Sequence, residues 1–208
     1  MSIEPTYIVG AIAIGIGATL LMDLWNLFLK RTFNVPSLNY CLLGRWLRHM
    51  PEGTVRHASI GAAPEKSFEC TVGWIAHYTI GVAFALLFVV LVSGDWLTRP
   101  TLLIALLYGI GTVVFPFFIM QPSLGLGIAA SKTPKPMQAR LKSLVTHTVF
   151  GVGLYLSALG ASNVLRVRSA GEPRDSVARR DSAAHADARQ DTDTMCFASR
   201  IGIPCDPR

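Results

Sequence analysis

The sequence predicts an all-α fold, a four-helix transmembrane bundle with an interfacial amphipathic helix and a disordered C-terminal tail. Charged residues make up 15% of the 208 residues, well below the roughly 25% that is usual in a soluble domain. Apolar residues make up 51% and gather in long runs. Those runs do not alternate with period two, so we expect helices, which satisfy their own backbone hydrogen bonds in lipid.

Four apolar runs are long enough to cross about 30 Å of hydrocarbon as helices. We expect membrane spans at about residues 7–29, 73–92, 101–120 and 144–164. Pro116 in the third run should kink its helix, because proline lacks the backbone donor. Residues 1–164 therefore form the expected membrane domain. Residues 165–208 are polar and too poor in large apolar side chains to bury a core, so a disordered tail is expected there.

Lysine and arginine gather in the two longer connections between these runs, which predicts the orientation. The basic residues of these connections are Lys30, Arg31, Arg45, Arg48, Arg56, Lys66, Lys132, Lys135, Arg140 and Lys142. The short turn holds only Arg99, and no lysine or arginine precedes the first run. The positive-inside rule then places both long connections in the cytoplasm and both termini outside. The net charge of +6 thus indicates contact with the lipid bilayer rather than with nucleic acid.

The first long connection contains an amphipathic segment at about residues 37–50. Helical spacing places one set of apolar side chains on a single arc: Leu42, Leu43, Trp46, Leu47 and Met50. Arg45, Arg48 and Cys41 fall on the opposite arc. One interpretation is an interfacial helix with Arg45, Trp46 and Arg48 at the membrane surface. The other is a lid packed on the other helices.

Three ionisable residues lie inside the apolar runs, where such residues are costly and usually face the protein interior. They are Asp23, His77 and His147. Asp23 precedes Lys30 by seven residues, or about 10 Å at 1.5 Å per residue, and both histidines lie near the same end of their runs. With Asn26 on the face of Asp23, these residues predict a polar cluster of Asp23, Asn26, His77 and His147.

Several functions remain open for this cluster. Asp23 and a histidine can hydrogen-bond across helices and fix the packing, or they can handle a proton or small ion. Asp23, His77 and His147 are also candidate ligands of a metal ion, and the two histidines are candidate axial ligands of haem. The chain contains no enzyme motif such as G-x-S-x-G or H-E-x-x-H. The leading expectation is a non-enzymatic protein without a catalytic residue or resident cofactor.

Two histidine-centred segments of the chain resemble each other. "HYTIGVAF" at residues 77–84 and "HTVFGVGL" at residues 147–154 share His, Gly and Val in register, and "GIG" occurs in both preceding runs, at 15–17 and 109–111. The match suggests two parallel helical hairpins that arose by duplication.

The cysteines show no C-x-x-C spacing, so neither a metal site nor a disulfide framework is expected. They are Cys41, Cys70, Cys196 and Cys205. A Cys196–Cys205 bridge stays open if the tail is extracytoplasmic.

Five segments together resemble a known family. They are "MDLWNLFLKR" (22–31), "GRWLRHMPEG" (44–53), "GWIAHYTIGVAFA" (73–85), "RPTLLIALLYGIGTVVFPFFIMQPSLGLGIAASKTPKP" (99–136) and "RLKSLVTHTVFGVGLYL" (140–156). Over roughly residues 5–163 the chain resembles the bacterial membrane-protein family called domain of unknown function 2938. The resemblance implies a small four-span protein of the bacterial inner membrane, and it implies no activity. A bundle of this size often associates with a second copy or with partner subunits, which are expected partners besides lipid.

Overall fold

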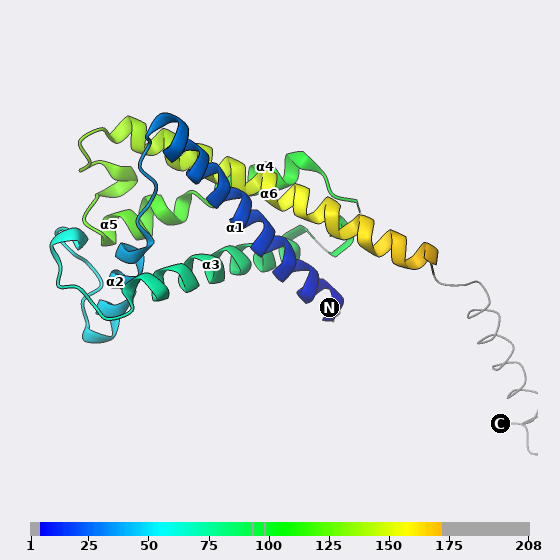
Figure 1. Ribbon diagram of the computed structural model, residues 1–208, viewed down its shortest axis with the longest axis horizontal. Helices are drawn as coiled ribbons and strands as arrows, with labels where there is room; N and C mark the ends of the chain where they lie inside the picture. The colour runs from blue at the N-terminus through cyan, green and yellow to red at the C-terminus, as the bar shows by residue number, and fades with distance from the viewer. Residues whose placement is uncertain (1–4, 93, 98, 172–208) are drawn as a thin grey trace, which may run out of the picture. The chain divides into compact units, whose positions relative to one another are not determined.

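The computed structural model describes residues 5–92, 94–97 and 99–171, which form an all-α structure without a strand in that part of the chain (Figure 1). Its α-helices are α1 (Pro5–Phe33), α2 (Tyr40–His49), α3 (Glu69–Val92), α4 (Leu102–Gly111), α5 (Gln121–Ser123) and α6 (Pro136–Gly171). Helix α6 continues beyond the boundary expected at residue 164. The predicted disorder of the tail concerns mainly residues 172–208, which lie outside the described residues, as do Cys196 and Cys205.

Four helical segments are long and apolar enough to cross a membrane, which confirms the predicted four-helix architecture. These spans are Ile8–Phe33, Glu69–Val92, Leu102–Ser123 and Pro136–Ser162. Large apolar side chains on them point away from the protein, and Val9, Leu91 and Leu103 are each more than 60% exposed. Exposed apolar surface of this extent is typical of helices that contact lipid.

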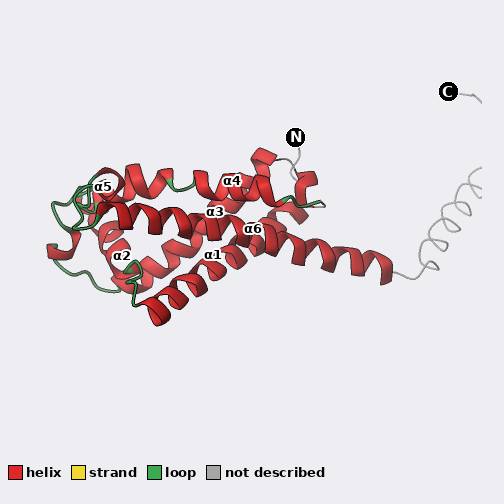
Figure 2. Ribbon diagram, turned by 90° about the horizontal axis from the view of Figure 1, so that it is seen from above, coloured by secondary structure: helices red, strands yellow, loops and turns green. Residues whose placement is uncertain are grey.

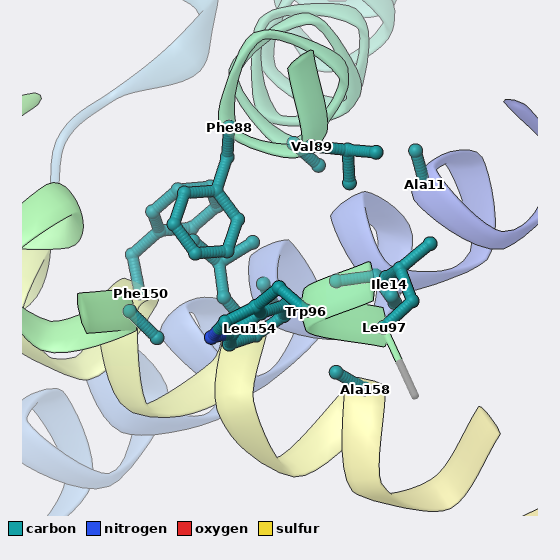
Figure 3. Close-up of a cluster of buried hydrophobic side chains, with 12 residues drawn as sticks. Ala11, Ile14, Phe88, Val89, Trp96, Leu97, Phe150, Leu154 and Ala158 are labelled. Carbon is teal, nitrogen blue, oxygen red and sulfur yellow. The ribbon is translucent and has the colours of Figure 1, made fainter. Parts of the chain in front are cut away.

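The core lies where α1, α3 and α6 meet the short turn between α3 and α4 (Figure 3). Phe88 from α3 and Leu154 from α6 are fully buried, and the ring of Trp96 from the turn contacts Phe88 with centroids 4.7 Å apart. Ala11 and Ala18 from α1 are fully buried as well. Small residues on α1 thus allow the larger rings of the other elements to fill the centre.

Each predicted hairpin closes at a pair of glycines. A Cβ atom on Gly15 of α1 would lie 2.7 Å from the Cα of Val82 on α3, and Gly81 on α3 packs against Thr19 of α1. A Cβ atom on Gly109 of α4 would lie 2.4 Å from the Cα of Gly151 on α6. Gly15 and Gly109, and likewise Gly81 and Gly151, occupy corresponding positions of the predicted repeat. In both hairpins the two helix backbones therefore approach closely at corresponding glycines.

The third span is interrupted rather than simply kinked at proline. Helix α4 ends at Gly111, and a π-helical turn, Pro116–Met120, precedes α5. The ring of Pro116 cannot donate to the preceding turn, which accounts for the departure from α-helical hydrogen bonding. The span ends at Ser123, beyond the expected end at residue 120, because Pro122 lies near the start of a new turn, where a missing donor is tolerated.

Helix α2 packs along the first part of α3, as expected of a lid. It begins at Tyr40 rather than near residue 37, and Asn39 caps it by accepting a hydrogen bond from the backbone of Cys41 at 3.0 Å. Of the three residues expected at the membrane surface, only Arg48 is exposed, whereas Arg45 and Trp46 are 6% and 8% exposed. The expectation of surface exposure is thus wrong for both residues. Arg45, on the polar arc, meets Glu69 of α3, and Trp46, on the apolar arc, packs in a buried cluster with Ile60 and Leu124.

The two long connections lie at the same end of the bundle, where α2 and α5 meet in both views (Figures 1 and 2). His57 donates its backbone hydrogen to the carbonyl of Ser123 at 2.9 Å, and Ile60 donates to the carbonyl of Leu124 at 3.1 Å. These bonds join the first connection to the one between the third and fourth spans. They agree with the expectation that both connections lie on one side.

Candidate functional site

Asp23 on α1 and His77 on α3 meet inside the bundle. The Nε2 atom of His77 lies 3.0 Å from Oδ1 of Asp23, and the two side chains are 10% and 16% exposed. His77 lies on the same face of α3 as Gly81, one turn away. The close contact of Gly81 with Thr19 brings α1 and α3 together at this face. The predicted proximity of these two residues is therefore present in the structure.

Tyr40 at the start of α2 completes this site, and the sequence analysis did not identify it. Its hydroxyl donates to Oδ1 of Asp23 at 3.0 Å. Its ring stacks on the His77 imidazole with centroids 4.1 Å apart and an interplanar angle of 24°. Burial, and then the negative charge of Asp23, raise the pKa of the Tyr40 phenol, so this group stays protonated and remains a donor.

The two carboxylate oxygens of Asp23 differ in their partners. Oδ2 is buried and has no hydrogen-bond partner among the described residues, although Oδ1 accepts from both His77 and Tyr40. A buried polar atom without a partner is costly and uncommon. A proton, a water molecule or a small cation on Oδ2 would remove that cost.

His147 on α6 is engaged elsewhere. Its Nδ1 atom lies 2.7 Å from the hydroxyl of Thr112, and that hydroxyl lies 2.5 Å from the carbonyl oxygen of Gly109. The carbonyl can only accept, and a hydroxyl has one proton. Thr112 therefore donates to Gly109, and His147 donates from Nδ1 to Thr112, so Nδ1 carries a proton.

The predicted four-residue cluster is thus divided. Asn26 is half-buried, and no hydrogen bond joins it or His147 to Asp23 in the part of the chain that the structure describes. No group of three or more His, Cys, Asp or Glu side chains among the described residues could hold a metal ion. The candidate metal ligands Asp23, His77 and His147 are therefore not brought together as a set.

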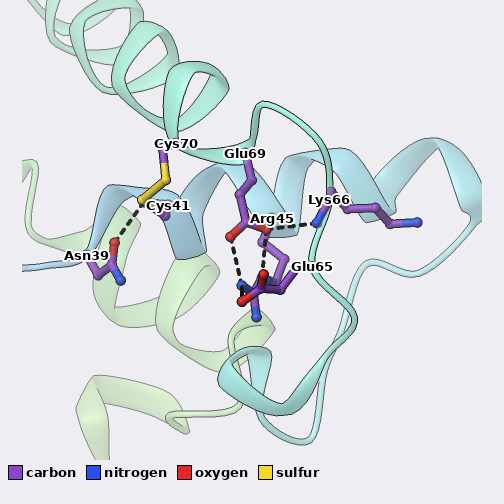
Figure 4. The surroundings of a disulfide bond; sticks show 7 residues. All are labelled: Asn39, Cys41, Arg45, Glu65, Lys66, Glu69 and Cys70. Carbon is purple, nitrogen blue, oxygen red and sulfur yellow. Dashed lines mark hydrogen bonds and ion pairs between the residues drawn. A yellow bond between two sulfur atoms is a disulfide. The ribbon is translucent and has the colours of Figure 1, made fainter.

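Next to this site, a disulfide joins Cys41 of α2 to Cys70 at the start of α3 (Figure 4). The expectation that these cysteines form no disulfide is wrong. The pairing follows from the packing, since Gly44 and Gly73 lie at the point where α2 crosses α3. Each cysteine precedes one of these glycines by three residues, and this shared C-x-x-G spacing is the signal that could have revealed the pair.

An ion pair also joins α2 to α3 (Figure 4). The guanidinium of Arg45 binds both carboxylate oxygens of Glu69, with Nε–Oε2 at 2.8 Å and Nη2–Oε1 at 2.7 Å. Hydrogen bonds to Glu69 and Glu65 raise the pKa of Arg45 despite its burial. The backbone of Lys66 donates to the same Glu69 carboxylate at 2.9 Å, so Glu69 both fixes the turn before α3 and holds α2.

Comparison with known proteins identifies the family. The family model described as Protein of unknown function (DUF2938) matches residues 12–161. The matched range contains all three residues of the site, Asp23, Tyr40 and His77, and it confirms the resemblance seen in the sequence. No curated protein and no solved structure matches the chain. The chain belongs to this family of unknown function.

Proposed function

We propose that this chain is a non-enzymatic, multi-pass protein of the bacterial inner membrane in which the Asp23–His77 site takes up and releases a proton. The observation that supports the proposal is the buried Oδ2 atom of Asp23, which has no partner beside a carboxylate–imidazole contact. The four apolar spans support the membrane location. A buried polar atom without a partner is uncommon in a contact that only fixes helix packing.

The chemistry of the pair suits reversible protonation. Imidazole titrates near neutral pH, and small changes in its surroundings move it across the physiological range. With Asp23 ionised, uptake of one proton converts the pair from a net charge of −1 to a neutral ion pair. The Tyr40 hydroxyl donates to the carboxylate, which stabilises the ionised form while the proton is absent.

Proton flux into liposomes tests this function. Purified protein is reconstituted with a pH-sensitive dye inside, and a potassium diffusion potential drives proton entry. We expect a pH-dependent flux that Asp23→Asn and His77→Gln each reduce at least tenfold. Each substitution removes one of the two titratable groups between which the proton is held. His147→Gln is the matched control, since His147 is also a histidine inside a span but bonds to Thr112; this variant should keep the flux.

The opposite outcome is equally clear. If Asp23→Asn leaves every pH-dependent signal unchanged and only lowers thermal stability, Asp23 and His77 form a packing contact and the proposed function is wrong.

We also propose that both long connections face the cytoplasm. The density of lysine and arginine there supports this orientation, although Arg45 is neutralised by Glu69. Cytosolic thiols are kept reduced, so we expect Cys41 and Cys70 to be free thiols in intact cells. They should react with a membrane-permeant maleimide and not with an impermeant one. The disulfide should form after purification in air. A Cys41–Cys70 disulfide present in cells that were quenched with acid would instead place these connections outside.

A further inference from the structure

The two long connections and the end of the third span line an open pocket of about 520 Å³ at their common end of the bundle. Arg56 and His57 line it from the first connection, and Ser131 and Lys132 line it from the connection before α6. The backbone bond from His57 to Ser123 holds the two connections together at this point. A Cβ atom on Gly125 would lie 2.2 Å from the carbonyl oxygen of Ala58, so the connections touch without an intervening side chain.

The charge of this pocket is positive and uncompensated. Arg56 and Lys132 line it, and the lining contains no aspartate or glutamate. Neither cation takes part in an ion pair within the described ranges, where the acidic partners are Asp23, Glu52, Glu65 and Glu69. Two cations without counter-charges at one concave site favour an anion.

His57 adds polar groups that lack a partner. Both of its ring nitrogens are buried and make no hydrogen bond among the described residues. Its ring meets that of His49 edge-on, with centroids 5.0 Å apart, so its neighbour offers an aromatic contact and no acceptor. Because at least one ring nitrogen carries a proton, the covered His57 ring holds a donor without an acceptor next to the two cations.

The loop that carries Ser131 has a backbone that is unfavourable for its residues. Ala129 and Ala130 have φ angles of 47° and 58°, in the left-handed region that is unfavourable for a non-glycine residue. A Cβ atom on Gly127 would lie 2.3 Å from the Ser131 hydroxyl, so glycine is needed for that hydroxyl to occupy its position. Such strain clusters at ligand-binding sites more often than elsewhere.

The pocket also borders the apolar surface of the third span. Phe118 on the π-helical turn and Ile128 in the loop both line it, and each side chain is 58% exposed. A positively charged pocket next to exposed apolar side chains suits a ligand that has both a phosphate group and an apolar part. Lipid headgroups present this combination at the membrane surface, where basic pockets between helices bind them.

We propose that the pocket formed by Arg56, His57, Ser131 and Lys132 binds a phosphate group, carried by an anionic lipid or present as free phosphate. The guanidinium and the ammonium neutralise the phosphate, and the Ser131 hydroxyl donates to one of its oxygens. The site is separate from the Asp23–His77 pair and does not depend on the proposed proton function.

Binding to the purified full-length protein tests the proposal. Native mass spectrometry in mixed micelles compares retention of phosphatidylglycerol with that of phosphatidylcholine, and thermal unfolding at constant ionic strength compares sodium phosphate with sodium chloride. Arg56→Gln/Lys132→Gln removes both cations. Arg48→Gln/Lys135→Gln is the matched control, because it removes two exposed cations of the same connections that do not line the pocket.

We expect the Arg56→Gln/Lys132→Gln protein to lose at least tenfold in retention of phosphatidylglycerol, while the control double variant retains it as the wild type does. A shift of the melting midpoint by inorganic phosphate that depends on the same two residues would identify free phosphate as the source. Equal losses in both double variants, or no retention and no shift in the wild type, would overturn the site. Asp23→Asn should change neither readout, which separates this result from the proton experiment.

Discussion

Gly73→Ala is expected to destabilise the bundle by about 3 kcal/mol or more. A Cβ atom at Gly73 would lie 1.8 Å from the carbonyl oxygen of Tyr40 and 2.7 Å from its carbonyl carbon. Both are backbone atoms, so no side-chain rotation can relieve the clash and α2 has to move away from α3. The measurement is the midpoint of thermal unfolding of the purified protein in detergent micelles. Gly44→Ala tests the crossing from the other helix, since its Cβ atom would lie 1.7 Å from the carbonyl oxygen of Glu69.

Gly111→Ala and Gly160→Ala are the controls for this crossing. Nothing lies within 4 Å of a Cβ atom at either position, and both residues belong to spans. Alanine should leave stability unchanged or raise it by about 0.5–1 kcal/mol, because glycine costs more backbone entropy in a helix. Equal melting midpoints for Gly73→Ala and these controls would show that α2 and α3 do not pack as closely as described.

Arg45→Met should lower the free energy of unfolding by about 1–3 kcal/mol, the range for a hydrogen-bonded charge that loses its partner. The side chains of Arg45 and Glu69 are 7% and 12% exposed, so methionine would leave a covered carboxylate with only the backbone bond from Lys66. The pair lies at the end of the bundle where solvent is close. The expected loss is therefore smaller than for a charge buried at the centre of a protein.

The double variant Arg45→Met/Glu69→Met separates the cost of the orphaned charge from the value of the pair. It should be more stable than Arg45→Met, because an apolar pair of similar size removes the uncompensated carboxylate. The coupling energy comes from the four melting midpoints of the double-mutant cycle. Arg48 lies on the exposed face of α2, so Arg48→Met should have the same melting midpoint as the wild type. Additive single losses would show that the ion pair contributes nothing.

The spans and the common depth of Asp23 and His77 could be predicted from the sequence because both depend on distance along a helix. Runs of apolar residues set where each helix crosses lipid. A rise of 1.5 Å per residue then places Asp23 and His77 at one depth. His147 has the appropriate depth, but it faces Thr112 on α4, because rotation about the helix axis depends on packing. Depth can be read from residue spacing, whereas orientation within the bundle cannot.

The contacts of α2 could not be predicted, because its amphipathic pattern describes a helix with one buried face. Gly44 lets the opposite face approach α3 as well, so Arg45 becomes a buried partner of Glu69 and Cys41 meets Cys70. Tyr40 reaches Asp23 by the same packing. Hydrophobic periodicity shows which face of a helix is apolar. It does not show where a glycine allows the backbone of another helix to approach.

In the oxidised protein, three unlike connections hold α2 on α3: a covalent bond, a close glycine contact and an ion pair. Tyr40 and His77 consequently belong to one rigid body, whereas Asp23 is carried by α1. Opening the site then requires a displacement of α1 and the loss of both hydrogen bonds to its carboxylate, rather than the lifting of a lid. Reduction of the disulfide or high salt would loosen the contact of α2 with α3, and neither would by itself uncover Asp23. Spin labels on α1 and α3 would therefore measure the relevant displacement, that of α1.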